Sequence, residues 1–304
     1  MIKKSFLFAL MVIFLFNIPA DGKDRLLIDE AGRKVKIPNP TKRIISLAPS
    51  ITEILFALGL NEEIAAVTKF CDYPDAVFGK PRIGGFVNPD IEKIVSLKPD
   101  LIMGIRDGNP TETVDRLGHF GFPVYLIDPK GFNGVIATIK NIGDVVGRER
   151  ESKRMIKELF EKRENVITLT RSLSRPRVFF QVGDVPLVTV GKGTLADDLI
   201  RLAGGRSISE NEADSYPSYS IETVLGKAPE IIIMSSMPGK DHTHLAKRWQ
   251  NWKSIPAVKM NAIHVIDSNL VDRPTPRITE GLEALVSIIH PEVLTIKPRP
   301  EQKR

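Results

Sequence analysis

Residues 91–104 are Ile91-Glu92-Lys93-Ile94-Val95-Ser96-Leu97-Lys98-Pro99-Asp100-Leu101-Ile102-Met103-Gly104, a short amphipathic pattern, a Pro-Asp pair and an apolar run. This order predicts a helix that stops before the proline and leads into a buried strand, because proline removes a backbone donor and restricts the residue before it. Residues 221–234 repeat the pattern as Ile221-Glu222-Thr223-Val224-Leu225-Gly226-Lys227-Ala228-Pro229-Glu230-Ile231-Ile232-Ile233-Met234. The chain therefore contains the same helix–strand unit twice.

The segments around this unit are repeated in the same order. Each copy is preceded by an apolar strand pattern and a helix pattern, and is followed by a second strand pattern. Three matched pieces indicate two related lobes rather than a solenoid, whose repeats are about 20–50 residues long. We therefore predict an α/β fold of two related lobes with mostly parallel sheets. The matched pairs are residues 43–47 with 177–182, 52–59 with 194–204, and 123–128 with 262–267.

The longest helical pattern lies between the two repeats, in residues 148–174. Met155, Ile156 and Leu159 follow helical spacing, and charges of opposite sign occur three and four positions apart around them. We predict one long α-helix that joins the lobes and, because a helix does not bend like a Gly/Ser linker, only small movement between them. The predicted division is a signal peptide at 1–20, an N-terminal lobe at 21–147, the linking helix at 148–174, a C-terminal lobe at 175–290 and a basic tail at 291–304.

The N-terminus has the pattern of a secretory signal. Lys3 and Lys4 precede an apolar run at residues 5–18, and Pro19-Ala20 ends in the small residue that a signal peptidase needs. The run is shorter than the roughly 20 apolar residues of a membrane span. We expect cleavage near residue 20 and export to the periplasm. No Cys follows the run directly, which argues against a lipid anchor.

Charge and cysteine content limit the class of protein further. The chain has 43 basic and 37 acidic residues, and loss of Lys3 and Lys4 lowers the net charge from +6 to +4. Basic residues are scattered, except in the tail, and do not alternate with aromatic residues, so we expect no nucleic-acid partner. Cys71 is the only cysteine and has no partner for an internal disulfide. The stability of the lobes must therefore come from their apolar cores.

The sequence offers little support for catalysis or for a metal centre. The five histidines are His119, His242, His244, His264 and His290, and none accompanies a Gly-x-Ser-x-Gly elbow. His242 and His244 are two positions apart, but no third or fourth ligand follows at a metal-binding spacing, which favours an exposed loop over a metal site. We predict no catalytic residue, no resident cofactor and no metal site, and retain a secreted enzyme as an alternative.

Several polar and aromatic residues are expected at the carboxyl ends of strands, where open α/β sheets bind their ligands. Ser50 precedes a helix and has Glu53 three positions on, so it either forms a capping box or offers a helix N-terminus to a ligand. Phe86 lies next to a Gly-Gly pair, and is either a platform for a flat ligand or an anchor into the core. The other candidates in such positions are Phe70, Asp72, Tyr73, Ile105 and Arg106.

Glu92 and Glu222 occupy the same position in the two copies of the repeat, near the start of a helix. An acid there stabilises the helix dipole by about 0.3–1 kcal/mol. A symmetric pair of acids, one in each lobe, would also suit docking onto a two-fold partner that carries basic residues. Both interpretations stay open at this point.

In combination, four motifs resemble the periplasmic binding proteins for cobalamin, haem and ferric siderophores, over roughly residues 40–290. The resemblance implies two Rossmann-like lobes on one long helix, a monomer that supplies a membrane ABC importer, and one Glu in each lobe that pairs with arginines of the permease. Glu92 and Glu222 fall on those positions. The motifs are residues 43–53 (Arg43 to Glu53), Asp72-Tyr73-Pro74, residues 92–102 (Glu92 to Ile102) and Pro276-Arg277-Ile278.

Within this family the likeness is strongest to the cobalamin binders, so the resemblance implies cobalamin as the bound ligand. Phe70, Phe86, Tyr216 and the pair Asp272-Arg273 fall where those proteins place aromatic and polar contacts. Phe70 and Phe86 occupy positions where the cobalamin binders have Tyr and Trp, and Ile105 occupies a position where a Trp would be expected. The iron ligand of haem binders, a Tyr, is absent near Phe86. Haem or a ferric siderophore, a corrinoid-processing enzyme and a sensor domain remain alternatives.

Overall fold

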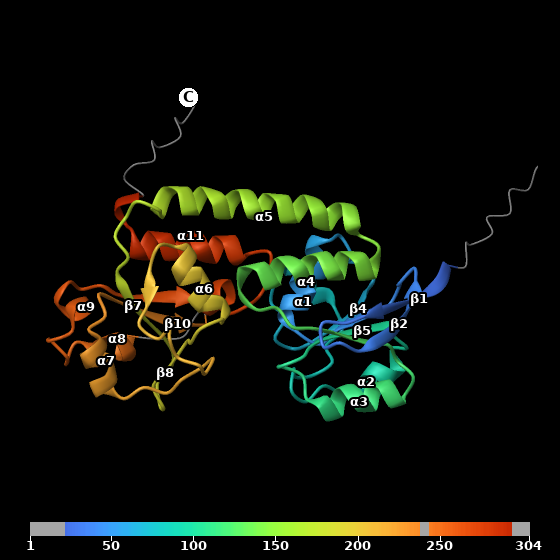
Figure 1. Cartoon of the computed structure of the whole chain (residues 1–304). Coiled ribbons are helices and arrows are strands. Elements are labelled where there is room, and N and C mark those ends of the chain that lie inside the picture. Colours follow the sequence, from blue (N-terminus) through green and yellow to red (C-terminus); the bar gives the residue numbers. More distant parts are fainter. Residues whose placement is uncertain (1–21, 238–242, 294–304) are drawn as a thin grey trace, which may run out of the picture.

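The computed structural model describes residues 22–237 and 243–293, and contains two α/β lobes that lie side by side beneath one long helix (Figure 1). The N-terminal lobe has a four-stranded sheet of order β4-β3-β5-β6, in which every neighbouring pair is parallel. Its elements are the hairpin strands β1 (Gly22–Ile28) and β2 (Lys34–Asn39), then β3 (Ile44–Ser46), α1 (Pro49–Ala57), β4 (Ile64–Val67), the 3-10 helix η1 (Asp75–Gly79), α2 (Ile91–Ser96), β5 (Leu101–Ile105), α3 (Thr111–His119), β6 (Val124–Ile127) and α4 (Gly131–Val146).

The C-terminal lobe repeats this sheet with small additions. Strands β7, β10 and β11 are parallel neighbours in the same relation as β3, β5 and β6, and β9 pairs with β7 as β4 pairs with β3. The antiparallel strand β8 is an extra element. The elements are β7 (Arg177–Gly183), β8 (Val188–Thr189), α6 (Leu195–Leu202), β9 (Arg206–Ser207), α7 (Ile221–Lys227), β10 (Ile231–Ser236), α8 (Thr243–Trp249), α9 (Pro256–Lys259), β11 (Ile263–Asp267), α10 (Ser268–Val271) and α11 (Ile278–Ile289).

The repeated sequence unit folds in the same way in both lobes, down to its backbone conformation. Helices α2 and α7 both end before the proline that each copy of the repeat contains. Lys98 and Ala228, the residues directly before Pro99 and Pro229, both have φ of 46°. A left-handed residue is uncommon outside glycine, so its recurrence at one position of the repeat marks the same sharp turn from helix to strand.

A pair of charged side chains fastens this turn to the first strand in each lobe. Arg43 and Arg177, at matching positions, donate through their guanidinium groups to a carbonyl at the end of the helix, at 2.6 and 3.0 Å. The acids after the prolines accept the backbone N–H of the same arginines, Asp100 from Arg43 at 2.9 Å and Glu230 from Arg177 at 2.8 Å. The Pro-acid pair of the sequence repeat thus stops a helix and also clamps two strands together.

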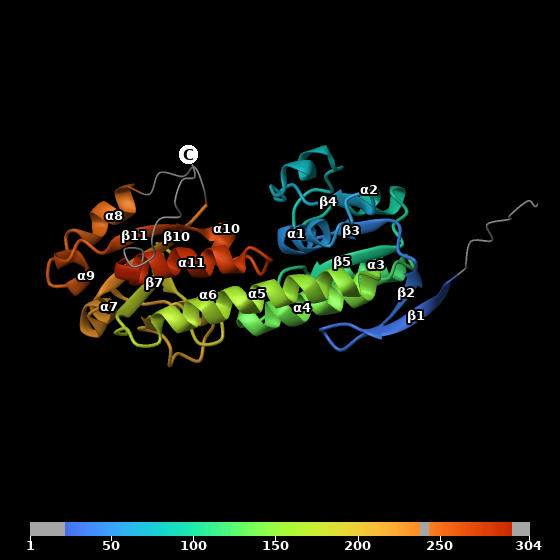
Figure 2. The same cartoon turned by 90° about the horizontal axis from the view of Figure 1, so that it is seen from above.

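The helix predicted between the repeats is α5 (Glu149–Thr170), which runs along both lobes (Figures 1 and 2). Helix α4 of the first lobe and α11 of the second lie beneath it. One continuous apolar core joins these helices to the inner faces of both sheets and includes Phe132, Leu159, Leu199 and Leu282. The lobes are therefore held by a shared core as well as by the chain connection.

Each sheet is covered on its other face by a separate core. In the first lobe Ile45, Ile102 and Leu117 pack beneath α2 and α3. In the second lobe Phe179 and Trp249 meet edge to face, with ring centroids 5.5 Å apart. Both lobes are therefore three-layered, as a doubly wound α/β fold requires.

Some expectations fall outside the described residues. The predicted signal peptide (1–20), most of the basic tail (291–304) and His242 lie outside the described residues. The predicted lobe boundaries at 147–148 and 174–175 stay predictions.

We expect Leu159→Ala to lower the free energy of unfolding by about 2–5 kcal/mol, because it leaves a cavity where α5 meets the shared core. Leu159 is 4% exposed, whereas Leu169 on the same helix is 39% exposed. Leu169→Ala is therefore the matched control, with an expected change within about 0.5 kcal/mol. Urea unfolding measures both values. Equal effects of the two substitutions would contradict the role assigned to α5.

Candidate functional site

A cleft of about 370 Å³ lies between the lobes and is lined by side chains from both. On the N-terminal side the lining includes Ile105, the last residue of β5, and Asp128, which directly follows β6. On the C-terminal side it includes segments around the start of α6 and directly after α10. These are the carboxyl-end positions at which open α/β sheets bind ligands. The lining residues are Phe86, Ile105, Asp107, Gly108, Asp128, Pro129, Lys130, Gly193, Thr194, Leu195, Ser215, Tyr216, Asp272 and Pro274.

Four of the predicted ligand-binding residues meet in this cleft. Phe86 and Ile105 come from the first lobe, and Tyr216 and Asp272 come from the second. They are up to 186 positions apart in the sequence (86 to 272), and the fold alone brings them together. Sequence reasoning missed Leu195 and Pro274 in the lining, because an apolar residue in a helix or after a proline-rich turn does not differ in pattern from a core residue.

The other predicted residues do not line this cleft. The Phe70 ring is 50% exposed, and the Lys69 ammonium lies 5.1 Å from its centre. Arg106 donates to Asp128 at 3.2 Å, so it contacts the cleft through a lining carboxylate. Their binding roles stay predictions.

The capping box predicted for Ser50 and Glu53 is wrong. The N-cap of α1 is Ala48, which makes no side-chain cap, and Ser50 lies within the first turn of the helix. Ser50 is 3% exposed, and its Oγ has no hydrogen-bond partner among the described residues. Glu53 does not reach back to the helix start, because its carboxylate binds arginines of the other lobe.

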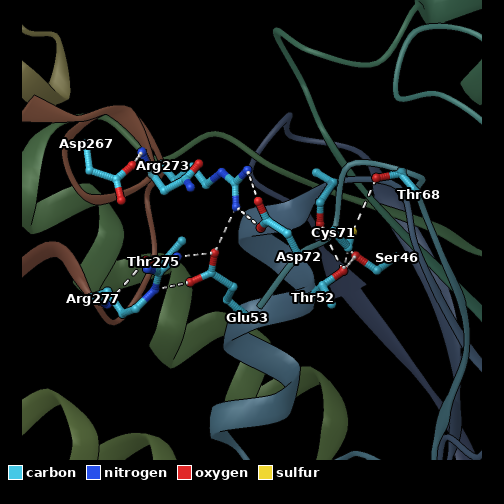
Figure 3. Close-up of polar contacts among 12 residues, drawn as sticks. Ser46, Thr52, Glu53, Thr68, Cys71, Asp72, Asp267, Arg273, Thr275 and Arg277 are labelled. Carbon is cyan, nitrogen blue, oxygen red and sulfur yellow. Dashed lines mark hydrogen bonds and ion pairs between the residues drawn. The ribbon is translucent and has the colours of Figure 1, made fainter. Parts of the chain in front are cut away.

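Glu53 is the centre of a polar network that crosses between the lobes (Figure 3). It is 3% exposed and accepts two hydrogen bonds from Arg277, both at 2.8 Å. Its Oε1 atom also accepts from Arg273 at 3.3 Å, and Arg273 donates to Asp72 at 2.5 and 3.3 Å. The Arg277 guanidinium stacks 4.1 Å from the centre of the Tyr73 ring. Two arginines of the C-terminal lobe are thus bound to three side chains of the N-terminal lobe.

This network changes the interpretation of three predicted ligand contacts. Asp72 and Tyr73 contact arginines of the C-terminal lobe, and Arg273 binds carboxylates of the N-terminal lobe. These three residues are therefore not directed only at a ligand. Burial alone would lower the pKa of Arg273, but its hydrogen bond and ion pair with Asp72 and the charge of Glu53 outweigh it and raise the pKa. The guanidinium therefore stays charged and braces the lobes beside the cleft. The Pro276-Arg277 pair of this interlobe network is part of the sequence motifs. No local pattern connects Arg277 to Glu53.

Asp272 is one of three acids that line the cleft. Partial desolvation by the surrounding protein raises the pKa of its carboxyl group, and the charge of Asp267 acts in the same direction. The Ser235 hydroxyl opposes this by donating to the carboxylate at 2.5 Å. Asp272 therefore presents a hydrogen-bonding group that is fixed on one side and faces the cleft on the other.

Two further hollows share lining residues with the cleft. One, of about 450 Å³, shares Asp272 with the cleft and lies at the carboxyl ends of β7 and β10. The other, of about 830 Å³, shares Lys130 and Gly193 with it. Pockets for drug-sized ligands measure about 300–1,000 Å³, so the cleft by itself is large enough for a small-molecule ligand.

Large apolar side chains are exposed in the loops that follow the strands. In the first lobe Phe70 and Tyr73 follow β4, at 50% and 45% exposure. In the second lobe Val185 follows β7 at 85% and Met237 follows β10 at 59%, and Tyr216 is 63% exposed within the cleft lining. Exposed apolar groups gathered at strand ends are typical of a binding surface for an apolar ligand.

Glu92 and Glu222 are both exposed in the first turn of their helices. The Glu222 carboxylate accepts hydrogen bonds from its own backbone N–H and from the Ser220 hydroxyl, which lowers its pKa. In Figure 1, α2 and α7 lie on the side of the molecule away from α5. The two acids are therefore accessible, one in each lobe.

Within the described part of the chain, no His or Cys lines the cleft, and no helix has both the length and the apolar character needed to cross a membrane. A cleft with aromatic and aliphatic walls, a few fixed polar groups and two lobes to enclose a ligand defines a solute-binding protein. The cleft therefore has the apolar and polar groups needed to hold a small molecule.

The chain belongs to the periplasmic binding protein family, whose profile matches residues 44–270. The vitamin B12-binding protein of Vibrio vulnificus is 29% identical over 245 residues, which cover 80% of this chain and 88% of that one. The crystal structure of the periplasmic vitamin B12 binding protein of Vibrio cholerae superimposes with a TM-score of 0.73 at 28% identity, and covers 85% of this chain and 99% of that one. A Staphylococcus epidermidis structure described as a possible iron-binding (periplasmic solute-binding) protein has a TM-score of 0.74 and 29% identity, over 83% and 100% of the chains.

These matches confirm the predicted family and fold class. The family consists of solute-binding proteins of the periplasm, so binding rather than turnover is its common property.

We expect Glu53→Gln to lower the free energy of unfolding by about 3 kcal/mol, because it leaves two largely buried arginines without their carboxylate. Asp72→Asn is the matched control. The Asp72 side chain is 47% exposed, so the loss should not exceed about 1 kcal/mol. Urea unfolding measures both, and small-angle scattering of Glu53→Gln should detect a wider range of lobe arrangements. An unchanged scattering profile with unchanged stability would contradict the bracing role.

Proposed function

We propose that this protein captures cobalamin, or a close corrinoid, between its lobes and delivers it to the membrane permease of an ABC importer. One observation carries the proposal: Phe86 and Ile105 of one lobe line the same cleft as Leu195 and Tyr216 of the other. Such apolar walls suit the broad ring face of a corrinoid. The vitamin B12 in the names of the Vibrio relatives supports this choice of ligand.

The charge of the cleft favours a corrinoid over haem. Asp107, Asp128 and Asp272 line it together with Lys130, and Arg106 beside it pairs with Asp107 and Asp128, so the acids outnumber the bases by one. The two carboxylates of a haem would lie among these acids, and like charges brought together oppose binding. The amide groups around a corrin ring would instead donate hydrogen bonds to the carboxylates.

A ferric siderophore is the second candidate. It is supported by the Staphylococcus structure, which is as similar to this chain as the vitamin B12 binders are. A neutral or cationic iron chelate would fit the acidic cleft for the same reason as a corrinoid.

Delivery to the permease is assigned to Glu92 and Glu222. Their equivalent positions in the two lobes and their exposure support contact with a two-fold symmetric membrane partner that carries arginines. A monomer that presents one acid per lobe fits this arrangement. Export through a cleaved signal peptide at residues 1–20 completes the proposal.

The most direct test is the absorbance spectrum of the protein purified from cells that were supplied with cobalamin. We expect a corrinoid spectrum at one ligand per chain, because the cleft is a single site. A haem or iron-chelate spectrum under the same conditions, with no corrinoid bound after titration, would contradict the choice of cobalamin and favour the second candidate.

Phe86→Ala and Tyr216→Ala should each weaken cobalamin binding about tenfold or more, because buried aromatic contacts commonly contribute 1.4 kcal/mol or more at an interface. Isothermal titration calorimetry measures the affinities. Phe120→Ala is the control, since Phe120 is also an exposed aromatic residue, at 55%, but does not line the cleft. Unchanged affinity in both cleft variants would remove these residues from the site.

The double variant Glu92→Arg with Glu222→Arg should abolish cobalamin uptake by cells and leave the affinity for cobalamin unchanged. The reason is that each substitution turns an attraction to permease arginines into a repulsion. The control is Glu149→Arg with Glu158→Arg, which makes the same charge change at two exposed positions of α5. Normal uptake by the first double variant would rule out the docking role.

A further inference from the structure

Gly108 and Phe86 meet at the wall of the cleft, and a side chain at position 108 would displace the Phe86 ring from its place. A Cβ atom built on Gly108 would lie 2.6 Å from Cζ and 2.8 Å from Cε2 of the Phe86 ring. Gly108 does not have the positive φ that would itself call for glycine. The absence of a side chain at this position is therefore explained by the space that the Phe86 ring occupies.

Asn109, the next residue, holds the same wall together. It is 4% exposed, and its Oδ1 accepts the backbone N–H of Ile105 at 2.7 Å. Its Nδ2 donates to the carbonyl of Phe86 at 2.9 Å and to that of Leu47 at 3.4 Å. One amide side chain thus connects the end of β5, the segment after β3 and the loop that carries Phe86.

The loop needs this connection, because its tip has few other polar contacts. The base of the loop is fixed by backbone hydrogen bonds from Lys69 to Gly84 at 2.8 Å and from Asp90 to Ile83 at 2.8 Å. At the tip, residues 85–88, Asn109 supplies the one side-chain hydrogen bond found among the described residues, next to an isolated backbone bridge between Gly84 and Pro89. Val87 beside Phe86 is 52% exposed and adds little packing.

We propose that Gly108 and Asn109 are positioning residues that fix the Phe86 ring as a rigid wall for the ligand. This inference rests on the proposed function, because it assumes that the ligand packs against Phe86. A wall that is already in place before binding does not lose freedom when the ligand arrives, and this raises affinity without any new contact. Gly108 supplies the space for the ring, and Asn109 holds its backbone.

The test is a double-mutant cycle of Gly108→Ala and Phe86→Ala with cyanocobalamin, measured by isothermal titration calorimetry. Gly108→Ala should weaken binding about tenfold, because the new methyl group displaces the ring. In the Phe86→Ala background the same substitution should have no further effect, because the ring is gone. Gly118→Ala is the control, since a Cβ there meets nothing within 4 Å. Wild-type affinity in Gly108→Ala, or additive losses in the double variant, would overturn the proposal.

A second measurement needs no ligand and separates this inference from the proposed function. Asn109→Asp keeps an acceptor for Ile105 but loses the donor to Phe86. Amide hydrogen exchange at Lys69 and Asp90, whose N–H groups bond to the base of the loop, should become about tenfold faster in this variant, while exchange in β5 stays slow. Unchanged exchange at these two amides would contradict the positioning role. A wild-type protein that binds no cyanocobalamin would instead contradict the proposed function, and with it the role of the wall in affinity.

Discussion

The structure depends on a buried carboxylate that belongs to one lobe and is bound by the other. Glu53 is 3% exposed and accepts two short hydrogen bonds from Arg277, with Arg273 close by. A carboxylate in such a place is tolerated only when its charge is matched, so the arginines must stay where they are. Together with the shared core under α5, this fixes how the two lobes face each other. The relative position of the lobes, set by this network and this core, determines the shape of the cleft.

The repeated helix–strand unit explains why the facing surfaces are strand ends. In both lobes an arginine and an acid clamp the turn after the helix to the first strand, which sets the direction of every parallel strand that follows. Because each lobe has the same strand order, the carboxyl edge of each sheet carries the loops that reach the cleft. The repeated unit therefore gives the cleft one wall from each lobe, and helix α5, which joins the lobes, determines the distance between the walls.

The walls themselves differ between the lobes, which is what a ligand with two unlike faces requires. The first lobe offers Phe86 against the bare backbone of Gly108, a rigid and apolar surface. The second offers Tyr216 and an acid, Asp272, whose pKa is raised by the crowding around it. Asp272 is held by Ser235, and the Phe86 backbone is held by Asn109, so part of each wall is in place before a ligand arrives.

The sequence alone determined the class of fold, the duplication, the long helix and the family, because these depend on periodicity, on proline and acid positions, and on motifs that are local in the chain. It also identified Phe86, Ile105, Tyr216 and Asp272, which the cleft brings together. It assigned Glu53 to a helix cap and Arg273 to the ligand, since both assignments judge a side chain by its neighbours in sequence. Only the tertiary structure decided that Glu53 binds Arg277, 224 positions away, and that Gly108 makes room for Phe86. The physical reason is that charge pairing and the exclusion of one side chain by another act through space, and the sequence records no distance.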